Sequence, residues 1–547
     1  MKEKKISKDN VRFNTMAIIL IAIFCIALSP ITLQNDTFYT IKIGEHIMQN
    51  GIDMQDPFSY HDLKYTYPHW LYDVGIYLVY NIGGQGGIYI STIILSVILG
   101  VTMYLVNTKL TKNKLTSFVL TIGAMYLLRN YLAARAQLVT FILFLLTVYF
   151  IEMFLETKRK RYAIGLIIIP IIIANVHVAV FPFYFILYLP YMAEYMIYIL
   201  SNTSIIVNSS KIKTLQKKIK KAENEEEIQN IKIKIEKLEE RIKVLQARRE
   251  KANKNPYKII IKGNNNVKLL VIIMIICLFT GLLTPLGLTP YTYLVKTLQG
   301  TTTQNISEHL PLTLVQNLEF MCALIIFIII LTFTDTKIRL SDLFMLGGLV
   351  FLTFSTRRQF SMFTLVCTII LNRLICAMFN KYDPEGCKNL VKKMTGIIGM
   401  IITINLVLII SITNYKPKMN NSFVDENSYP VAAADYILNN IDIENMRLYN
   451  EYNYGSYLLF RGIPVFIDSR ADLYSPEFNE GVNVFNDYLD LSGLNIDNVE
   501  EVLDKYGITH LIMYKDARLR RFIEQDKERY EELYEDDHFC IYERKQV

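Results

Sequence analysis

The side chains in this sequence best suited to chemistry follow directly after an apolar run near the N-terminus. They lie in one polar stretch and include three carboxylates: Asp36, Asp56, His69, Trp70 and Asp73. A carboxylate at the edge of an apolar environment is partly desolvated, which favours proton acceptance or metal coordination. The spacing alone leaves two interpretations open, a structured loop with surface acids and an active site.

A second group of candidates is basic. Loops on the outer side of a membrane are expected to hold few Lys or Arg, yet five such residues fall in predicted outer turns: Arg129, Arg135, Lys296, Arg357 and Arg358. The planar guanidinium group presents N–H donors suited to phosphate oxygens, and its charge costs less near the interface than at the bilayer centre. An anionic lipid head group is therefore the expected partner. The alternative is that each residue ends a helix and extends its charge to the interface.

Two further residues could contribute to a site on the same side. His177 lies at the outer end of an apolar block, in IIIANVHVAVFPF, where a packing hydrogen bond is an alternative to ligand binding. Glu308 precedes Pro311 in another outer loop and is a candidate acid or substrate contact.

The elements that must position these residues are membrane helices. Of the 547 residues 52% are apolar, and they gather in blocks near the 17 to 25 residues that a helix needs to cross lipid. About eleven spans are predicted, some of them short. They lie near residues 16–34, 87–106, 117–128, 138–155, 163–176, 179–200, 268–285, 318–334, 342–354, 361–378 and 395–413.

Charge predicts the orientation of these spans. The N-terminus is basic, and so are the connections that alternate with the outer loops, which places the N-terminus in the cytoplasm. The same bias explains the net charge of +7, so a nucleic-acid partner is not expected. The prediction is a multi-pass protein of the plasma membrane, a polytopic α-helical membrane protein with a small extracytoplasmic α/β domain.

Four regions follow from this organisation. Residues 1–200 form the N-terminal membrane part, with a long external loop at 34–86, and residues 268–413 form the C-terminal membrane part. Residues 201–267 are a charged insertion between them. Residues 414–547 alternate helical patterns, at 432–439 and 499–506, with strand patterns at 464–467, 510–513 and 539–542, which is typical of an α/β domain.

The insertion carries apolar residues at heptad spacing: Ile228, Ile231, Ile235, Leu238, Ile242 and Leu245. This pattern predicts a cytoplasmic helical hairpin. A solvated charged helix that joins the two membrane halves and a coiled coil that binds a partner are the alternatives.

The order of short outer motifs resembles that of the GT-C superfamily of glycosyltransferases, which includes protein O-mannosyltransferases and the aminoarabinose transferase that modifies lipid A. The motifs are Asp36 with Gly44 and Gly51, DPFSY (56–60), HWLYD (69–73), Arg129 with Arg135, ANVH (174–177), Thr284-Pro285 ahead of SEHLP (307–311), STRRQF (355–360) and the segment 449–474. Three positions depart from the family pattern: His69 replaces an acid, Thr284 replaces an Asn, and ANVH lacks a following Gly.

The resemblance implies transfer of a hexose or pentose from a polyprenyl-phosphate carrier to an acceptor on the outer face, with inversion at the anomeric carbon. Asp36 is then the first candidate for the base, and Asp56 the second. The basic residues would bind substrate, together with Glu308, His177, His69, Trp70 and Asp73. A divalent metal ion near the carboxylates is a further possibility, and the acceptor is a glycan, lipid or protein of the cell envelope. A transporter of lipid-linked saccharides and a non-catalytic scaffold or sensor are the competing hypotheses.

Overall fold

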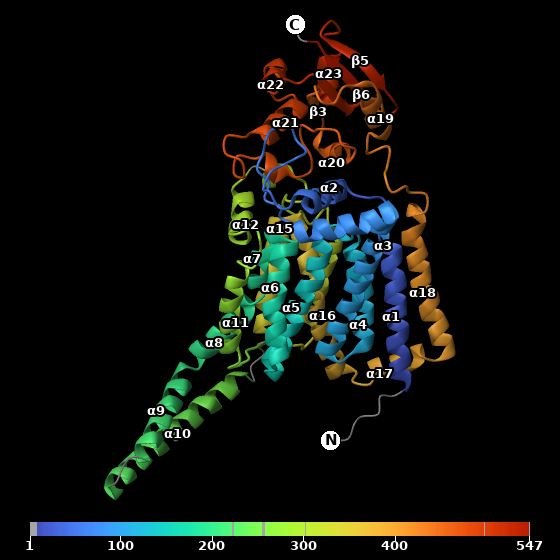
Figure 1. Cartoon of the computed structure of the whole chain (residues 1–547). Helices are drawn as coiled ribbons and strands as arrows, with labels where there is room; N and C mark the ends of the chain where they lie inside the picture. Colours follow the sequence, from blue (N-terminus) through green and yellow to red (C-terminus); the bar gives the residue numbers. More distant parts are fainter. Residues whose placement is uncertain (1–7, 221–223, 254–257, 301, 497, 546–547) are drawn as a thin grey trace.

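The computed structural model describes residues 8–220, 224–253, 258–300, 302–496 and 498–545. Its main body is a bundle of apolar helices, and a smaller domain that contains a β-sheet lies beyond one end of the bundle (Figure 1).

Among the described residues, six helical stretches are long and apolar enough to cross a membrane. They are α1 (Lys8–Leu28), α3 (Trp70–Thr111), α5 (Ala136–Thr157), α7 (Phe181–Ile186) with α8 (Leu189–Ser201), α16 (Phe360–Tyr382) and α18 (Ile397–Tyr415). Shorter apolar helices complete the bundle: α4 (Lys114–Leu127), α6 (Lys160–Val176), α11 (Val267–Thr280), α14 (Leu318–Phe333) and α15 (Leu340–Ser355). Each predicted span coincides with one of these helices, and together they indicate a membrane protein.

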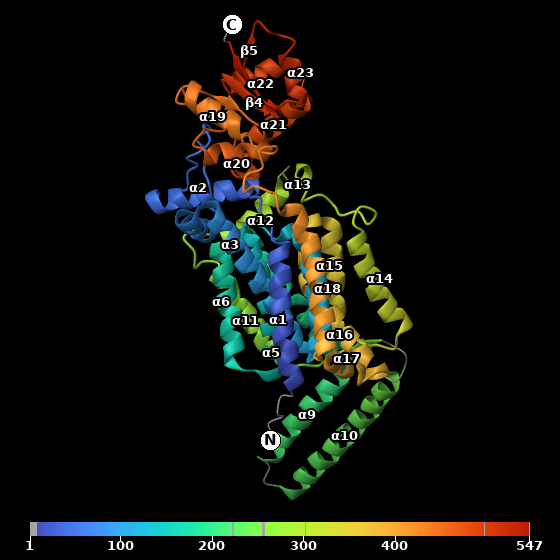
Figure 2. The same cartoon turned by 90° about the vertical axis from the view of Figure 1, so that its right-hand side faces the viewer.

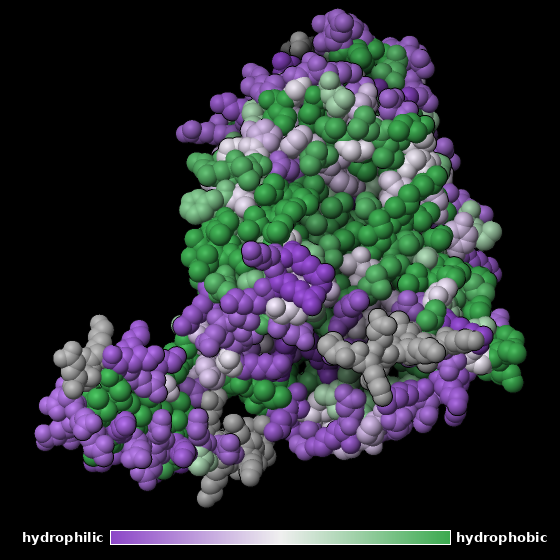
Figure 3. Space-filling view, turned by 60° about the horizontal axis from the view of Figure 1, so that its bottom comes forward, coloured by the Kyte–Doolittle hydropathy of each residue, from purple (hydrophilic) through white to green (hydrophobic). Residues whose placement is uncertain are grey.

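The surface of the bundle agrees with this conclusion. Large apolar side chains point outward, among them Phe333, 82% exposed, and Ile398, 75% exposed. Figure 3 shows a broad hydrophobic band on this surface, between two hydrophilic ends. Because exposed apolar area of this extent is unfavourable in water, a lipid environment accounts for it.

The predicted external loop at 34–86 is largely helical. α2 (Asn35–Asn50) and the first part of α3 lie across the end of the bundle, and α3 turns into the bundle at Gly84, whose φ of 56° is not helical (Figure 1). α2 crosses α3 at Gly44, where a Cβ atom would lie 2.1 Å from the backbone oxygen of Asp73. No helix was predicted within this loop from the sequence. α2 buries one face, which includes Phe38 and Ile41, and exposes the other.

The opposite end of the bundle carries the charged insertion. α9 (Thr203–Ile219) and α10 (Glu225–Asn253) lie side by side as the predicted hairpin and project from the end where α1 begins (Figures 1 and 2). The short α17 (Gly386–Met394) lies at the same end. Two short parallel strands, β1 (Ile259–Ile260) and β2 (Ile338–Arg339), join the chain after the hairpin to the start of α15.

The C-terminal domain has a four-stranded sheet in the order β3-β4-β6-β5. Its elements are α19 (Val431–Asn440), β3 (Leu448–Tyr449), α20 (Tyr452–Phe460), α21 (Val484–Gly493), α22 (Val499–Lys505), β4 (His510–Tyr514), α23 (Arg518–Ile523), β5 (Tyr530–Glu535) and β6 (Phe539–Arg544). The predicted helices and the strands at 510–513 and 539–542 are confirmed. The strand predicted at 464–467 was wrong, because Val465 makes only an isolated bridge to Ser59 and the segment packs on the outer loop instead of joining the sheet.

This domain shares its hydrophobic core with α2. The ring of Phe38 on α2 makes edge contacts with Tyr429 and Tyr457 of the C-terminal domain, at centroid distances of 5.1 and 5.2 Å. Such aromatic pairs are favourable beyond the area they bury. α2 and the C-terminal domain therefore form one packed unit, which fixes the start of α2 and the side chain of Asp36.

Candidate functional site

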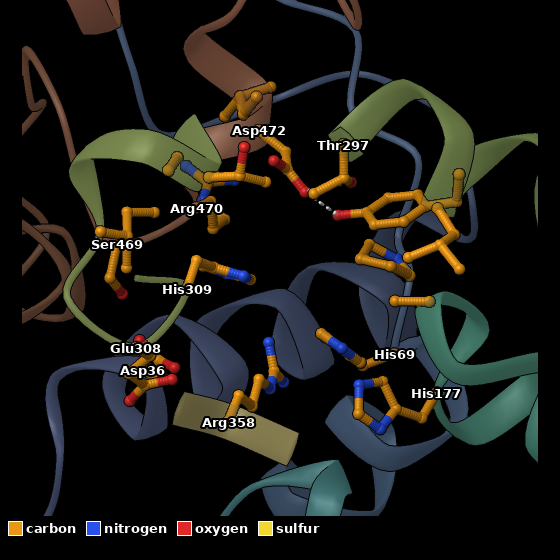
Figure 4. Close-up of a pocket in the computed structure, with 18 of the residues that line it drawn as sticks. Asp36, His69, His177, Thr297, Glu308, His309, Arg358, Ser469, Arg470 and Asp472 are labelled. Carbon is orange, nitrogen blue, oxygen red and sulfur yellow. Dashed lines mark hydrogen bonds between the residues drawn. The ribbon is translucent and has the colours of Figure 1, made fainter. Parts of the chain in front are cut away.

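A cavity of about 420 Å³ lies between the end of the helix bundle and the C-terminal domain. Its walls come from segments far apart in the sequence: the start of α2, the chain before α3, the starts of α5 and α16, the α6–α7 junction, α12 (Thr289–Gln299), the chain after α13 (Thr302–Asn305), and the 3₁₀ turn η5 (Ala471–Tyr474). Figure 4 shows Asp36 and Glu308 on one side of this cavity, His69 and His177 on another, and Arg358 between them.

Asp36 lies in the first turn of α2, where the exposed N–H groups of the helix favour a negative charge. Its Oδ2 lies 2.7 Å from Nη2 of Arg135, the residue just before α5. Nη1 of Arg135 donates to Oε1 of Glu308 at 3.1 Å. One guanidinium group therefore holds two carboxylates that come from distant parts of the chain.

The charges around Arg135 decide its protonation and that of Glu308. Burial alone would lower the pKa of Arg135, but the charges of Asp36 and Glu308 outweigh burial and raise it. Burial opposes ionisation of Glu308, but Arg135 and Arg358 outweigh it, so the pKa of Glu308 is lowered. The centre of this wall is thus a fixed positive charge beside ionised acid.

Two motifs noted in the sequence meet at this wall. The backbone N–H of Arg358 donates to the carbonyl of Glu308 at 3.1 Å, and the Thr356 hydroxyl donates to the same oxygen at 3.1 Å. Arg358 belongs to the 3₁₀ turn η3 (Arg357–Gln359) between α15 and α16. The STRRQF turn therefore positions the SEHLP segment, and the side chains of Arg358 and Glu308 enter the same cavity.

His69 and His177 lie together on the other side, with ring centroids 4.9 Å apart. Burial and the charges of Arg358 and Arg135 lower the pKa of His69 to about 3. Burial, His69 and the same arginines hold the pKa of His177 well below its usual value. Both rings are therefore neutral near pH 7, and each offers one hydrogen-bond donor and one acceptor. Nδ1 of His177 lies 3.3 Å from the Thr140 hydroxyl.

Asp472 lies at the centre of the cavity wall that the C-terminal domain contributes, and it was included in the sequence analysis only as part of the segment 449–474. Its carboxylate accepts hydrogen bonds from the hydroxyl groups of Tyr293, Thr297 and Thr302, at 2.9, 3.0 and 3.2 Å. Burial raises the pKa of Asp472, and these hydroxyl groups offset part of the increase. Asp472 thus joins the C-terminal domain to α12 and α13. The signal in the sequence was the series of hydroxyl residues between 289 and 303.

Seven of the predicted site residues line this cavity or a second one beside it. Asp36, His69, Arg135, His177, Glu308 and Arg358 line the larger, and Arg357 lines the second together with Arg135, Glu308 and Arg358. This second cavity, of about 220 Å³, is also lined by Gln34, Asn130, Tyr131 and Gln137.

Five predicted residues line neither cavity. Arg129 pairs with Glu319 at 2.7 Å, and Lys296 lies 5.5 Å from the ring centroid of Phe478. Nε1 of Trp70 donates to Asn175 at 3.2 Å. Asp73 is fully buried and both carboxyl oxygens are without a hydrogen-bond partner among the described residues.

The fifth is Asp56, whose side chain is fully buried. It accepts a hydrogen bond from Nη1 of Arg470 at 2.7 Å, and Arg470 also bonds Asp468, which accepts from the Tyr474 hydroxyl as well. This network ties the outer loop to the C-terminal domain. Because Asp56 has no face toward the cavity, we do not retain it as a base, and a positioning role fits its contacts.

The predicted metal ion finds no fitting set of ligands. In the described ranges no three His, Cys, Asp or Glu side chains converge in a way that could hold a metal ion, and Asp36 and Glu308 are both bonded to Arg135.

No protein-family model matches the chain, and no curated protein is significantly similar to it in sequence.

Proposed function

We propose that this chain is a membrane glycosyltransferase that moves a sugar from a polyprenyl-phosphate carrier to an acceptor on the outer face of the membrane. The observation that carries the proposal is the convergence of Asp36, Arg135, Glu308 and Arg358 on one cavity at the end of an apolar helix bundle. These residues belong to motifs that resemble those of the GT-C superfamily.

In this mechanism Asp36 accepts the proton of the acceptor hydroxyl group. The hydroxyl oxygen attacks the anomeric carbon, the bond from that carbon to the phosphate oxygen breaks on the opposite face, and the configuration inverts. The electron pair of the broken bond stays with the polyprenyl phosphate. Arg135 and Arg358 stabilise the negative charge that develops there. The neutral rings of His69 and His177 hydrogen-bond hydroxyl groups of the sugar or the acceptor.

We further propose that the eleven apolar helices all cross the plasma membrane. The start of α1 and the α9–α10 hairpin lie at one end of the bundle and the C-terminal domain at the other, which supports a cytoplasmic N-terminus and an extracytoplasmic C-terminal domain (Figure 1). Basic connections at the hairpin end support the same orientation. The cavity then opens at the outer surface, within reach of a lipid-borne phosphate and of envelope glycans, lipids or proteins.

The experiment that tests the proposal uses the purified full chain in liposomes with polyprenyl-phosphate sugars labelled in the sugar. Covalent transfer of the label to an envelope acceptor fraction is the expected result. Movement of the labelled lipid across the bilayer without transfer would identify a transporter, and neither transfer nor movement would favour a scaffold. Glu319→Gln, which removes a carboxylate outside both cavities, serves as the matched control and transfers at the wild-type rate.

A further inference from the structure

Arg135 lies at the boundary between the two cavities. Its side chain and that of Glu308 line both of them, whereas Asp36 lines only the larger. The guanidinium group bonds Asp36 through Nη2 and Glu308 through Nη1, and its buried Nε has no partner among the described residues. In the part of the chain that the structure describes, Arg135 is the residue that bonds both the candidate base and the second acid and also lines both cavities.

The larger cavity holds its candidate base in an ion pair. Asp36 is 21% exposed and Arg135 is 25% exposed, so water screens their attraction only in part. While the pair is intact, Oδ2 of Asp36 is occupied by the guanidinium group at 2.7 Å. Release from Arg135 frees this oxygen for the hydroxyl group of an acceptor.

The smaller cavity offers Arg135 a competing partner. Three arginines line it, Arg135, Arg357 and Arg358, against one acidic residue, Glu308, and its other polar residues are neutral. A phosphate group there would meet an excess of positive charge and N–H donors in planar, fork-like arrangements.

We propose that Arg135 couples the two cavities. A phosphate group bound in the smaller cavity draws the guanidinium away from Asp36 and Glu308, and Asp36 is then free to accept a proton in the larger one. This inference rests on the proposed function and adds an order of substrate binding to it. The acceptor is activated only when the phosphate-bearing donor is already in place.

Coupling of this kind is reciprocal, so it can be measured through binding alone. If the phosphate competes with the two acids for Arg135, then removing either acid must tighten phosphate binding. We expect Asp36→Asn and Glu308→Gln to lower the Kd for a polyprenyl phosphate about fivefold or more in the full chain in nanodiscs. Arg135→Gln removes the guanidinium group for which Asp36 and the phosphate compete, and in this background Asp36→Asn should change the Kd less than about twofold.

The matched control is Glu319→Gln, which removes an equal charge at the same end of the bundle. Glu319 forms an ion pair with Arg129, and neither residue lines a cavity. It should leave the Kd unchanged. A second arm uses inorganic phosphate. The same gain with the free ion assigns the coupling to the phosphate group itself, and a gain confined to the polyprenyl phosphate assigns it to the lipid-borne form.

Two results would count against the coupling in different ways. Wild-type binding of the polyprenyl phosphate with no gain from Asp36→Asn, or an equal gain from Glu319→Gln, would overturn the coupling and leave the proposed function standing. No binding to the wild type or any variant would overturn both.

Discussion

Replacing Arg470 by Met should separate the C-terminal domain from the outer loop. The side chain of Arg470 is 2% exposed, and those of Asp56 and Asp468 are fully buried. The substitution leaves two buried carboxylates without their cation, and removing one partner of a buried ion pair costs about 3 to 5 kcal/mol. The loss should appear where the outer loop meets the C-terminal domain, since Asp56 comes from the loop and Arg470 from the domain.

The assay is urea unfolding of the purified chain in micelles, followed by the fluorescence of Trp70, the single Trp of the sequence. Trp70 lies at the start of α3, against Asn175, and reports on the outer end of the bundle. Arg461→Ala is the matched control, because Arg461 pairs with the exposed Asp435 and surface pairs contribute about 0 to 1 kcal/mol. A loss for Arg470→Met no larger than that of the control would refute the reasoning.

Three further perturbations test other parts of the structure. Gly44→Ala should destabilise the packing of α2 on α3 by about 1 to 3 kcal/mol, because its Cβ would meet the Asp73 backbone. Gly75→Ala has open space around it inside α3 and should not destabilise in the same urea assay, since a helix favours Ala over Gly by about 0.5 to 1 kcal/mol. Equal effects would contradict the close crossing of α2 and α3. Asp472→Ala leaves three hydroxyl groups without their acceptor and should speed backbone hydrogen exchange in α12 and α13 by about tenfold. Unchanged exchange would argue against a role of Asp472 in holding α12 and α13 to the C-terminal domain. Burial and two arginines lower the pKa of His69 to about 3. The unfolded chain therefore binds an extra proton below pH ~6.5, and the stability of the fold decreases as the pH falls toward 3. His69→Gln should reduce the loss of stability between pH 7 and 5.5 by on the order of 1 kcal/mol, and an undiminished loss would place the titrating group elsewhere.

The helices of the bundle could be predicted from the sequence because hydropathy is a local property. A run of apolar residues long enough to cross lipid must satisfy its backbone hydrogen bonds within itself, and a helix does so. α2 could not be predicted this way, since its apolar face depends on Phe38 meeting Tyr429 and Tyr457 from the far end of the chain.

The residues of the candidate site could likewise be predicted only in part. Outer arginines that break the charge bias directed attention to Arg135 and Arg358, which line the cavities, and equally to Arg129, which pairs with Glu319 outside them. The sequence pattern is the same for all three. What distinguishes them is the partner that a distant segment brings to each, and Arg135 receives two carboxylates where Arg129 receives one.

The most direct test of the central claim is the rate of sugar transfer by Asp36→Asn in liposomes, measured beside its binding of the polyprenyl-phosphate donor. If Asp36 accepts the proton of the acceptor, transfer should fall by about 10² to 10⁴ while the donor still binds and the Trp70 fluorescence of the folded chain is unchanged. Transfer by Asp36→Asn at the wild-type rate would contradict the account.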